Sequence, residues 1–253
     1  MRLALTVEYE GTSYHGFQHQ ANAKSIQEEL EKAIARFTGE TVRVKAAGRT
    51  DSGVHARGQV VAFDTADGHS AETFVRALNY YLPADIAVKR ASPVPAAFDP
   101  RRHALSRVYR YTILNSATRS PLLRRTALQV EAPLDVAAMS SAAHLFVGRR
   151  DFARFSAARG ARGGSTVREI YWACASVDSE LIALDFEGSA FMPHQVRRMA
   201  GSLVDVGLGA FTPGDIKALL NGEECDAVAR TLPPHGLCLL RVNYADQPRL
   251  DGE

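Results

Sequence analysis

The chain has 253 residues, of which 46% are hydrophobic, and a formal net charge of +2. This length and apolar content allow a substantial core in one large domain or two modest ones. No apolar stretch approaches the roughly 20 residues of a membrane-spanning helix, and the start lacks a signal-peptide pattern, so we expect a soluble intracellular protein. The three cysteines form no CxxC pair, which argues against a disulfide framework and a cysteine zinc site.

Hydrophobic patterns predict strands and helices along the whole chain. A strand over 2–9 is followed by a helix that begins at the capping box Ser25–Glu28 and ends at Gly39. The later predicted elements are strands at 42–46 and 59–65, a helix at 71–82, strands at 85–92 and 106–115, a helix at 134–147, strands at 167–177 and 180–187, helices at 192–208 and 213–220, and a strand at 237–244.

This order of elements predicts an α+β fold of two similar-sized domains, with mostly antiparallel sheets covered by helices. The stretch PVPAAFDPRRHA is rich in proline and alanine and then charged, as is typical of a domain boundary. We therefore predict an N-terminal domain over 1–104 and a C-terminal domain over 105–253.

Basic residues are concentrated in one segment. Residues 101–168 contain 13 arginines, no lysine and three acidic residues, which gives that segment a net charge of +10. Such a segment in a nearly neutral chain favours a local anionic partner, and RNA is the obvious candidate. An arginine-rich composition of genomic origin is the competing explanation.

The segment AGRTDSGVHARGQ (47–59) is the strongest candidate for a functional site. It lies between two predicted strands and places Arg49, Asp51 and His55 among glycines, which permit backbone conformations that other residues resist. A loop that only connects strands needs a turn residue or two. The structural alternative is an Asx turn, in which the Asp51 side chain bonds its own backbone.

Several ordered segments resemble the tRNA pseudouridine synthase A family. Gly48–Ala56 is similar to the family's signature loop. Further similar segments are EYEGTSYHGFQ (8–18), SIQE (25–28), RVYRYTILN (107–115), FMPHQVRRMAGSLVDVG (191–207) and GLCLLRVNY (236–244). One departure is Gln195, where the family commonly has methionine.

The resemblance implies an enzyme that converts uridine to pseudouridine in tRNA. Such an enzyme breaks the N1–C1′ bond, turns the base and joins it through C5, without a metal or an organic cofactor. The implied substrate is the anticodon arm, at tRNA positions 38, 39 and 40. The family also implies a cytoplasmic homodimer with an active-site cleft between the two domains.

By resemblance Asp51 is the catalytic aspartate and is expected to act as the nucleophile. The chemistry needs an ionised carboxylate, which could attack the sugar or the base or remove a ribose proton, and the residues leave these routes open. A neighbouring cation would keep the carboxylate charged. Arg197 matches the family's helix arginine and is favoured as the ion-pair partner, and Arg49 is expected to contact an RNA phosphate or the flipped nucleotide.

Tyr109 matches the family's tyrosine that stacks on the target base once the base has left its helix. Tyr111 shares its strand face and is expected to be structural. His55 is predicted to bind substrate RNA, with stabilisation of the loop as the alternative.

Helical spacing places Arg197 on the shoulder of a buried stripe in 192–208. The same spacing predicts that Arg198 faces solvent, together with Ser202 and Asp205. A glycine-rich stretch at 159–164 is expected to contact RNA phosphates, with an exposed loop as the alternative. The arginines around it are Arg149, Arg150, Arg154, Arg159, Arg162 and Arg168.

Two other functions remain open. A related synthase could act on other tRNA positions or on another RNA, because the loop supports the type of reaction more than the choice of substrate position. A non-catalytic RNA-binding protein could use the same scaffold, although it would not need Asp51, Tyr109 and Arg197 together.

Overall fold

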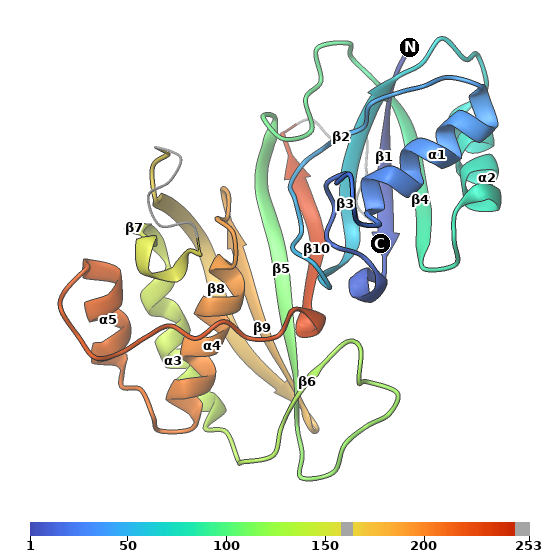
Figure 1. Cartoon of the computed structure of the whole chain (residues 1–253). Coiled ribbons are helices and arrows are strands. Elements are labelled where there is room, and N and C mark those ends of the chain that lie inside the picture. The colour runs from blue at the N-terminus through green and yellow to red at the C-terminus, as the bar shows by residue number, and fades with distance from the viewer. Residues whose placement is uncertain (158–163, 246–253) are drawn as a thin grey trace. The chain divides into compact units, whose positions relative to one another are not determined.

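The structure is a computed structural model that describes residues 1–157 and 164–245 and shows an α+β chain (Figure 1). The chain divides into two units. The first contains Met1–Leu105 and the chain from Cys238 onward, and the second contains Ser106–Leu237. The predicted domains 1–104 and 105–253 therefore need one correction, because the last strand belongs with the first unit.

The first unit is a sheet with two helices packed side by side against it (Figure 1). Its elements are β1 (Arg2–Tyr9), η1 (Gly11–Ser13), α1 (Ile26–Thr38), β2 (Lys45–Ala46), β3 (His55–Asp64), α2 (Ala71–Tyr81), β4 (Ile86–Val94) and β10 (Leu237–Tyr244). The strand order is β4-β1-β3-β10, and β2 also pairs with β3. β10 runs parallel to β3, with Cys238 opposite His55 and Leu239 opposite Ala56, and this pairing explains the correction.

The ends of α1 follow from its sequence. The Ser25 side chain accepts a hydrogen bond from the Glu28 N–H (3.3 Å), and Gly39 ends the helix at φ 74°. Ile26, Leu30 and Ile34 are buried, as their helical spacing predicts. The predicted helix is confirmed. Its first residues hold the preceding segment, because the Gln27 N–H donates to the Phe17 carbonyl (2.9 Å).

The second unit is also a sheet covered by helices. Its elements are β5 (Ala104–Asn115), β6 (Leu128–Val130), α3 (Val136–Ala143), η2 (His144–Phe146), β7 (Gly148–Asp151), η3 (Ala153–Phe155), β8 (Val167–Asp178), β9 (Leu181–Gly188), α4 (Gln195–Gly207), α5 (Pro213–Asn221) and η4 (Pro234–Gly236). The strand order is β5-β9-β8-β7, all antiparallel, and β6 pairs with β5 in parallel. α3 packs against β8 and α4 (Figure 1). No helix in the described residues has the length and apolar character of a membrane span.

Several predicted elements differ in extent from those of the structure, and three of these differences are informative. The strand expected at 42–46 is only Lys45–Ala46, because the Val44 N–H donates to the Glu31 carboxylate (3.0 Å) instead of a neighbouring strand. β3 begins at His55, so the end of the signature loop is already part of the sheet. The helix expected at 134–147 is α3, and its last turn tightens into η2.

Candidate active site

The loop that carries Asp51 is fastened to the segment before α1 by backbone hydrogen bonds. The Phe17 N–H donates to the Thr50 carbonyl (3.1 Å), and the Gly53 N–H donates to the Tyr14 carbonyl (3.2 Å). Thr50 and Gly53 lie on either side of Asp51. The loop is therefore held at two points, and a half-buried Asp51 lies between them.

Gly16 lies at the closest approach of these two segments. A Cβ there would lie 2.8 Å from the Thr50 carbonyl oxygen, and the backbone has a φ of +88°, which disfavours other residues. Within the loop, Gly53 also has a positive φ of 77°, and the Val54 N–H donates to the Asp51 carbonyl (3.2 Å). Gly53 thus permits the turn of the loop, and Gly16 permits the close approach of the segment before α1.

His55 stabilises this arrangement from inside the protein. It is 7% exposed, and its Nδ1 accepts a hydrogen bond from the Gly11 N–H (3.0 Å). An accepting Nδ1 carries no proton, so in the neutral ring the proton is on Nε2. This geometry matches the loop-stabilising alternative, and a contact of His55 with RNA stays a prediction. Arg49, by contrast, is exposed, as a contact to RNA requires.

Two residues that carry no clear signal in the sequence, Tyr9 and Gln59, form hydrogen bonds to the loop from the buried side. The Tyr9 hydroxyl lies 2.8 Å from the Thr50 hydroxyl. The Gln59 amide donates to the Gly48 carbonyl (3.0 Å) and lies 3.5 Å from the Tyr9 hydroxyl. The side chains of Tyr9, Thr50 and Gln59 are all buried. Burial raises the pKa of Tyr9 far above its ordinary value, so its hydroxyl stays protonated.

Tyr109 lies on β5 in the second unit and is nearly buried. Its ring meets Phe191 edge to face, with ring centroids 5.3 Å apart and planes at 83°. Phe191 comes from the segment just before α4, so two of the family-like motifs meet in this contact. The arrangement fixes the plane of the tyrosine ring.

Tyr111 has the structural role expected for it. It is fully buried, and its hydroxyl donates to the Pro233 carbonyl (2.8 Å). A Cβ at Gly236 would lie 2.7 Å from its ring, so only glycine fits there. Burial raises the pKa of Tyr111 well above its ordinary value, with Arg197 opposing the shift.

Arg197 is partly exposed on α4, and its Nε is anchored within the second unit. Its Nε donates to the Leu232 carbonyl (2.7 Å), and its own carbonyl accepts from the Leu232 N–H (3.3 Å). A bond at Nε orients the plane of the guanidinium group, because that group is rigid.

The prediction that Arg198 faces solvent is wrong. Its Nη1 donates to the Ser156 carbonyl (2.6 Å), and Ser202 and Asp205 on the same helix face are buried. The segment before η4 covers this face, where Asp205 pairs with Arg230 at 2.8 Å. Burial raises the pKa of the Asp205 carboxyl, and Arg230 opposes that shift.

A model of the tRNA pseudouridine synthase family matches residues 5–101 and 142–245. The chain belongs to this family.

Several relatives are similar to this member of the family over nearly the whole length. A tRNA pseudouridine synthase A of Pelobacter propionicus is 44% identical over 242 residues, which cover 96% of this chain and 99% of the relative. Proteins of the same name from Myxococcus xanthus and Geobacter sulfurreducens are 45% and 43% identical. They cover 98% and 96% of this chain, and 93% and 99% of their own lengths.

The residues assigned to the synthase site are divided between the two units. Asp51, Arg49 and His55 belong to the first, and Tyr109 and Arg197 to the second. Within the described parts of the chain, no three His, Cys, Asp or Glu side chains lie together as metal ligands would.

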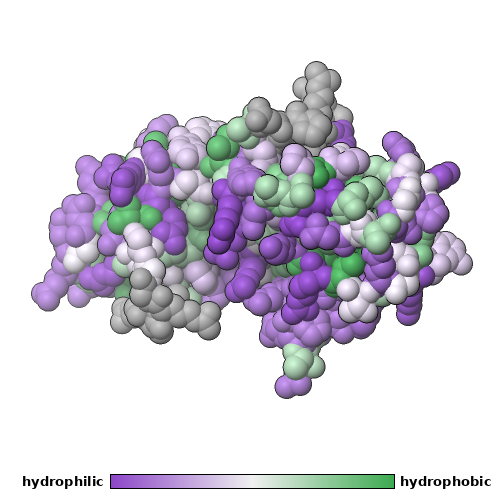
Figure 2. Space-filling model, turned by 90° about the horizontal axis from the view of Figure 1, so that it is seen from above, coloured by the Kyte–Doolittle hydropathy of each residue, from purple (hydrophilic) through white to green (hydrophobic). Residues whose placement is uncertain are grey.

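The arginines expected to contact RNA have different surroundings. Arg149 and Arg150 are exposed on β7. Arg154 donates to the Glu223 carbonyl (2.9 Å), and Arg168 to the Ser165 and Val167 carbonyls (both 2.7 Å). Arg159 and Arg162 lie outside the described residues. Hydrophilic side chains cover most of the face in Figure 2, with small apolar areas between them.

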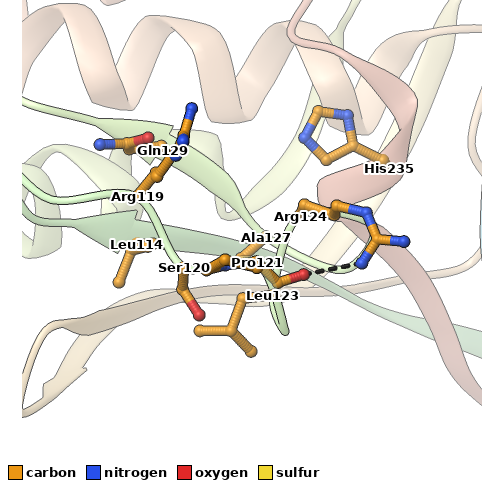
Figure 3. A pocket seen from close by; sticks show the side chains of 9 residues that line it. All are labelled: Leu114, Arg119, Ser120, Pro121, Leu123, Arg124, Ala127, Gln129 and His235. Carbon is orange, nitrogen blue, oxygen red and sulfur yellow. Dashed lines mark hydrogen bonds between the residues drawn. The ribbon is translucent and has the colours of Figure 1, made fainter.

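The second unit of this synthase also contains a pocket of about 500 Å³ (Figure 3). It is formed by the segment between β5 and β6 together with η4. Arg119, Arg124 and His235 line it, and neither Tyr109 nor Arg197 does.

Proposed function

We propose that this chain isomerises uridine to pseudouridine in the anticodon arm of tRNA, at positions 38, 39 and 40. The observation that carries the proposal is Asp51 in the family's signature loop, held at Thr50 and Gly53. Membership of the family supports the reaction type. The names of the relatives support tRNA as the substrate.

The reaction breaks the N1–C1′ bond and forms a C5–C1′ bond, the C5 proton leaves to solvent, and N1 gains a proton. The proposal assigns Asp51 as the nucleophile of this isomerisation. Attack on the sugar or base and removal of a ribose proton all require an ionised carboxylate. A cation beside Asp51 would keep it ionised, and Arg197 has this role in the proposal.

The target uridine must leave the stacked RNA before its glycosidic bond can be reached. In the proposal the Tyr109 ring replaces the lost stacking. Its edge-to-face contact with Phe191 supports this role, because a ring held in one plane orders little further on binding. Arg49, exposed beside Asp51, contacts the RNA backbone. The proposed assembly is a cytoplasmic homodimer, which sedimentation at several protein concentrations tests.

Tritium release tests the activity. Anticodon-arm RNA with tritium at uridine C5 is incubated with wild type, Asp51→Asn and the control Asp226→Asn, which alters an exposed carboxyl in the other unit. Wild type and the control should release tritium, and Asp51→Asn should not. Full release by Asp51→Asn would remove this residue from the mechanism.

A second outcome concerns the non-catalytic alternative. If wild type binds the RNA and releases no tritium, the RNA-binding function replaces the enzyme. Sequencing of modified tRNA from a deletion strain tests which tRNA positions are modified. Loss of pseudouridine elsewhere, with positions 38–40 unchanged, would contradict the proposed positions.

A further inference from the structure

The segment Arg230–Gly236 connects the proposed catalytic arginine to the pocket of Figure 3. Its start is tied to α4, where the Leu232 carbonyl accepts from Arg197 Nε (2.7 Å). Its middle is tied to β5, because the Pro233 carbonyl accepts from the Tyr111 hydroxyl (2.8 Å). Its end carries His235 into the pocket wall. The pocket is therefore fixed relative to Arg197 within one unit.

The chemistry of the pocket suits an anionic ligand with an apolar part. Two arginines and a histidine line it together with Ser120 and Gln129, and no carboxylate belongs to the lining. The Arg124 Nη1 donates to the Pro121 carbonyl (2.8 Å), which holds the guanidinium group against the segment that forms the pocket (Figure 3). Leucine and proline side chains supply the apolar part of the wall.

Its size and position match one nucleotide of an RNA strand. A volume of about 500 Å³ is typical of small-molecule sites. Leu232 and His235 are three residues apart, so their Cα atoms are at most about 11 Å from each other. Phosphates in a helical strand advance by about 3.4 Å along the axis and lie further apart through space, so about three nucleotides is the upper limit for that reach.

We propose that this pocket binds the ribose-phosphate of an RNA nucleotide that lies within about three nucleotides of the target uridine. Arg119 and Arg124 neutralise the phosphate, and the apolar wall contacts the sugar or base. This proposal rests on the proposed function, because the position of Arg197 beside the target defines the distance.

The test uses anticodon-arm RNA and the double variant Arg119→Glu/Arg124→Glu. The charge-matched control is Arg36→Glu/Lys217→Glu, which alters exposed residues on α1 and α5. Binding is measured by fluorescence anisotropy over a range of salt concentrations. The pocket variant should bind at least about tenfold more weakly, and its salt slope should fall by about one for each phosphate that it no longer neutralises. The control should stay near wild type.

Neutral methylphosphonate linkages locate the contact. They are placed one at a time at the three phosphates on each side of the target. Wild type should lose affinity at one or two of these linkages, and the pocket variant should be insensitive at the same linkages. Equal losses for both proteins at every linkage would overturn the subsite.

Tritium release by wild type separates the two proposals. Release without any coupling between the arginines and a linkage would overturn the subsite and leave the enzyme in place. Coupling without release would overturn the enzymatic function and keep an RNA-binding pocket. A changed oligomeric mass of the pocket variant with unchanged RNA affinity would assign the pocket to subunit association instead.

Discussion

The hydroxyl of Tyr9 contacts the residue directly before the proposed catalytic carboxylate. It lies 2.8 Å from Thr50 Oγ1 in a buried environment. On the other side of Arg49, the Gln59 amide donates to the Gly48 carbonyl. A buried hydrogen bond between neutral groups contributes about 0.5–1.5 kcal/mol. At the residue scale, this is enough to influence how often Asp51 occupies its reactive position.

Tyr9→Phe removes one hydroxyl and leaves the ring in the core. We expect kcat for tritium release to fall by about tenfold, which corresponds to about 1.4 kcal/mol, with little change in the KM for tRNA. The readout is the separation of kcat from KM, because a purely structural loss would lower the amount of active enzyme and the melting temperature instead.

Tyr244→Phe is the matched control for this prediction. It removes a tyrosine hydroxyl from the same unit, where that group donates to the Pro100 carbonyl (2.8 Å). Its kcat should equal that of wild type. Equal values for Tyr9→Phe and Tyr244→Phe would show that Tyr9 does not position the loop.

These supporting residues could not be found from the sequence. Asp51 stands out because its neighbours are unusual for a connecting loop. Tyr9 has the alternating pattern of an ordinary buried strand residue, and its partner lies 41 positions away. Gln59 is a polar residue at the start of an apolar run, which is a weak signal, since its role depends on a carbonyl in the folded loop.

At the element scale, the segment before α1 and the Asp51 loop fit together only because Gly16 lacks a side chain. Gly39 at the end of α1 has a similar φ of 74°, but no atom lies within 4 Å of the position of its Cβ. A substitution at either glycine therefore strains the backbone, but only a substitution at Gly16 also creates a steric clash.

Gly16→Ala and Gly39→Ala test this difference by urea unfolding and tritium release. Both should lose stability through a left-handed backbone, by about 1–2 kcal/mol. Gly16→Ala should lose more and should also lose activity in its folded state, because its Cβ displaces the Thr50 carbonyl. Equal activity of the two variants would contradict the proposed rigidity of the loop.

Helix α4 shows why periodicity predicted only one of its two buried faces. The stripe that contains Met199 and Leu203 was visible from spacing alone. The opposite face holds Ser202 and Asp205, which a helical pattern assigns to solvent. It is covered by a segment some 30 positions further along the chain, and Asp205 is buried there against Arg230. Such cover depends on tertiary structure, not on local pattern.

At the scale of the whole molecule, the chain leaves the first unit, builds the second and returns with β10. Leu239 is buried where β10 pairs with Ala56 of β3. Gly58 lies against the Leu240 carbonyl, where a Cβ would be only 2.5 Å away. The start of β3, which follows the Asp51 loop, therefore has β10 as its neighbour in the sheet.

Leu239→Ala should destabilise the protein by about 2–5 kcal/mol, as is usual for a buried leucine. Amide exchange should accelerate in β3 more than in β8 and β9. Leu219→Ala removes an equally buried side chain from α5 in the second unit and should show the reverse pattern. Identical exchange profiles in the two variants would mean that the units unfold as one.

The return of β10 also has a consequence for synthesis on the ribosome. Translation produces β3 long before β10, so one edge of β3 at His55 and Ala56 has no strand partner from β10 while the second unit is made. Unpaired strand edges promote aggregation and attract chaperones. A nascent chain cut short before Cys238 thus contains the whole Asp51 loop but lacks the strand that pairs with β3 directly after it, so this part of the sheet forms only once β10 has been made.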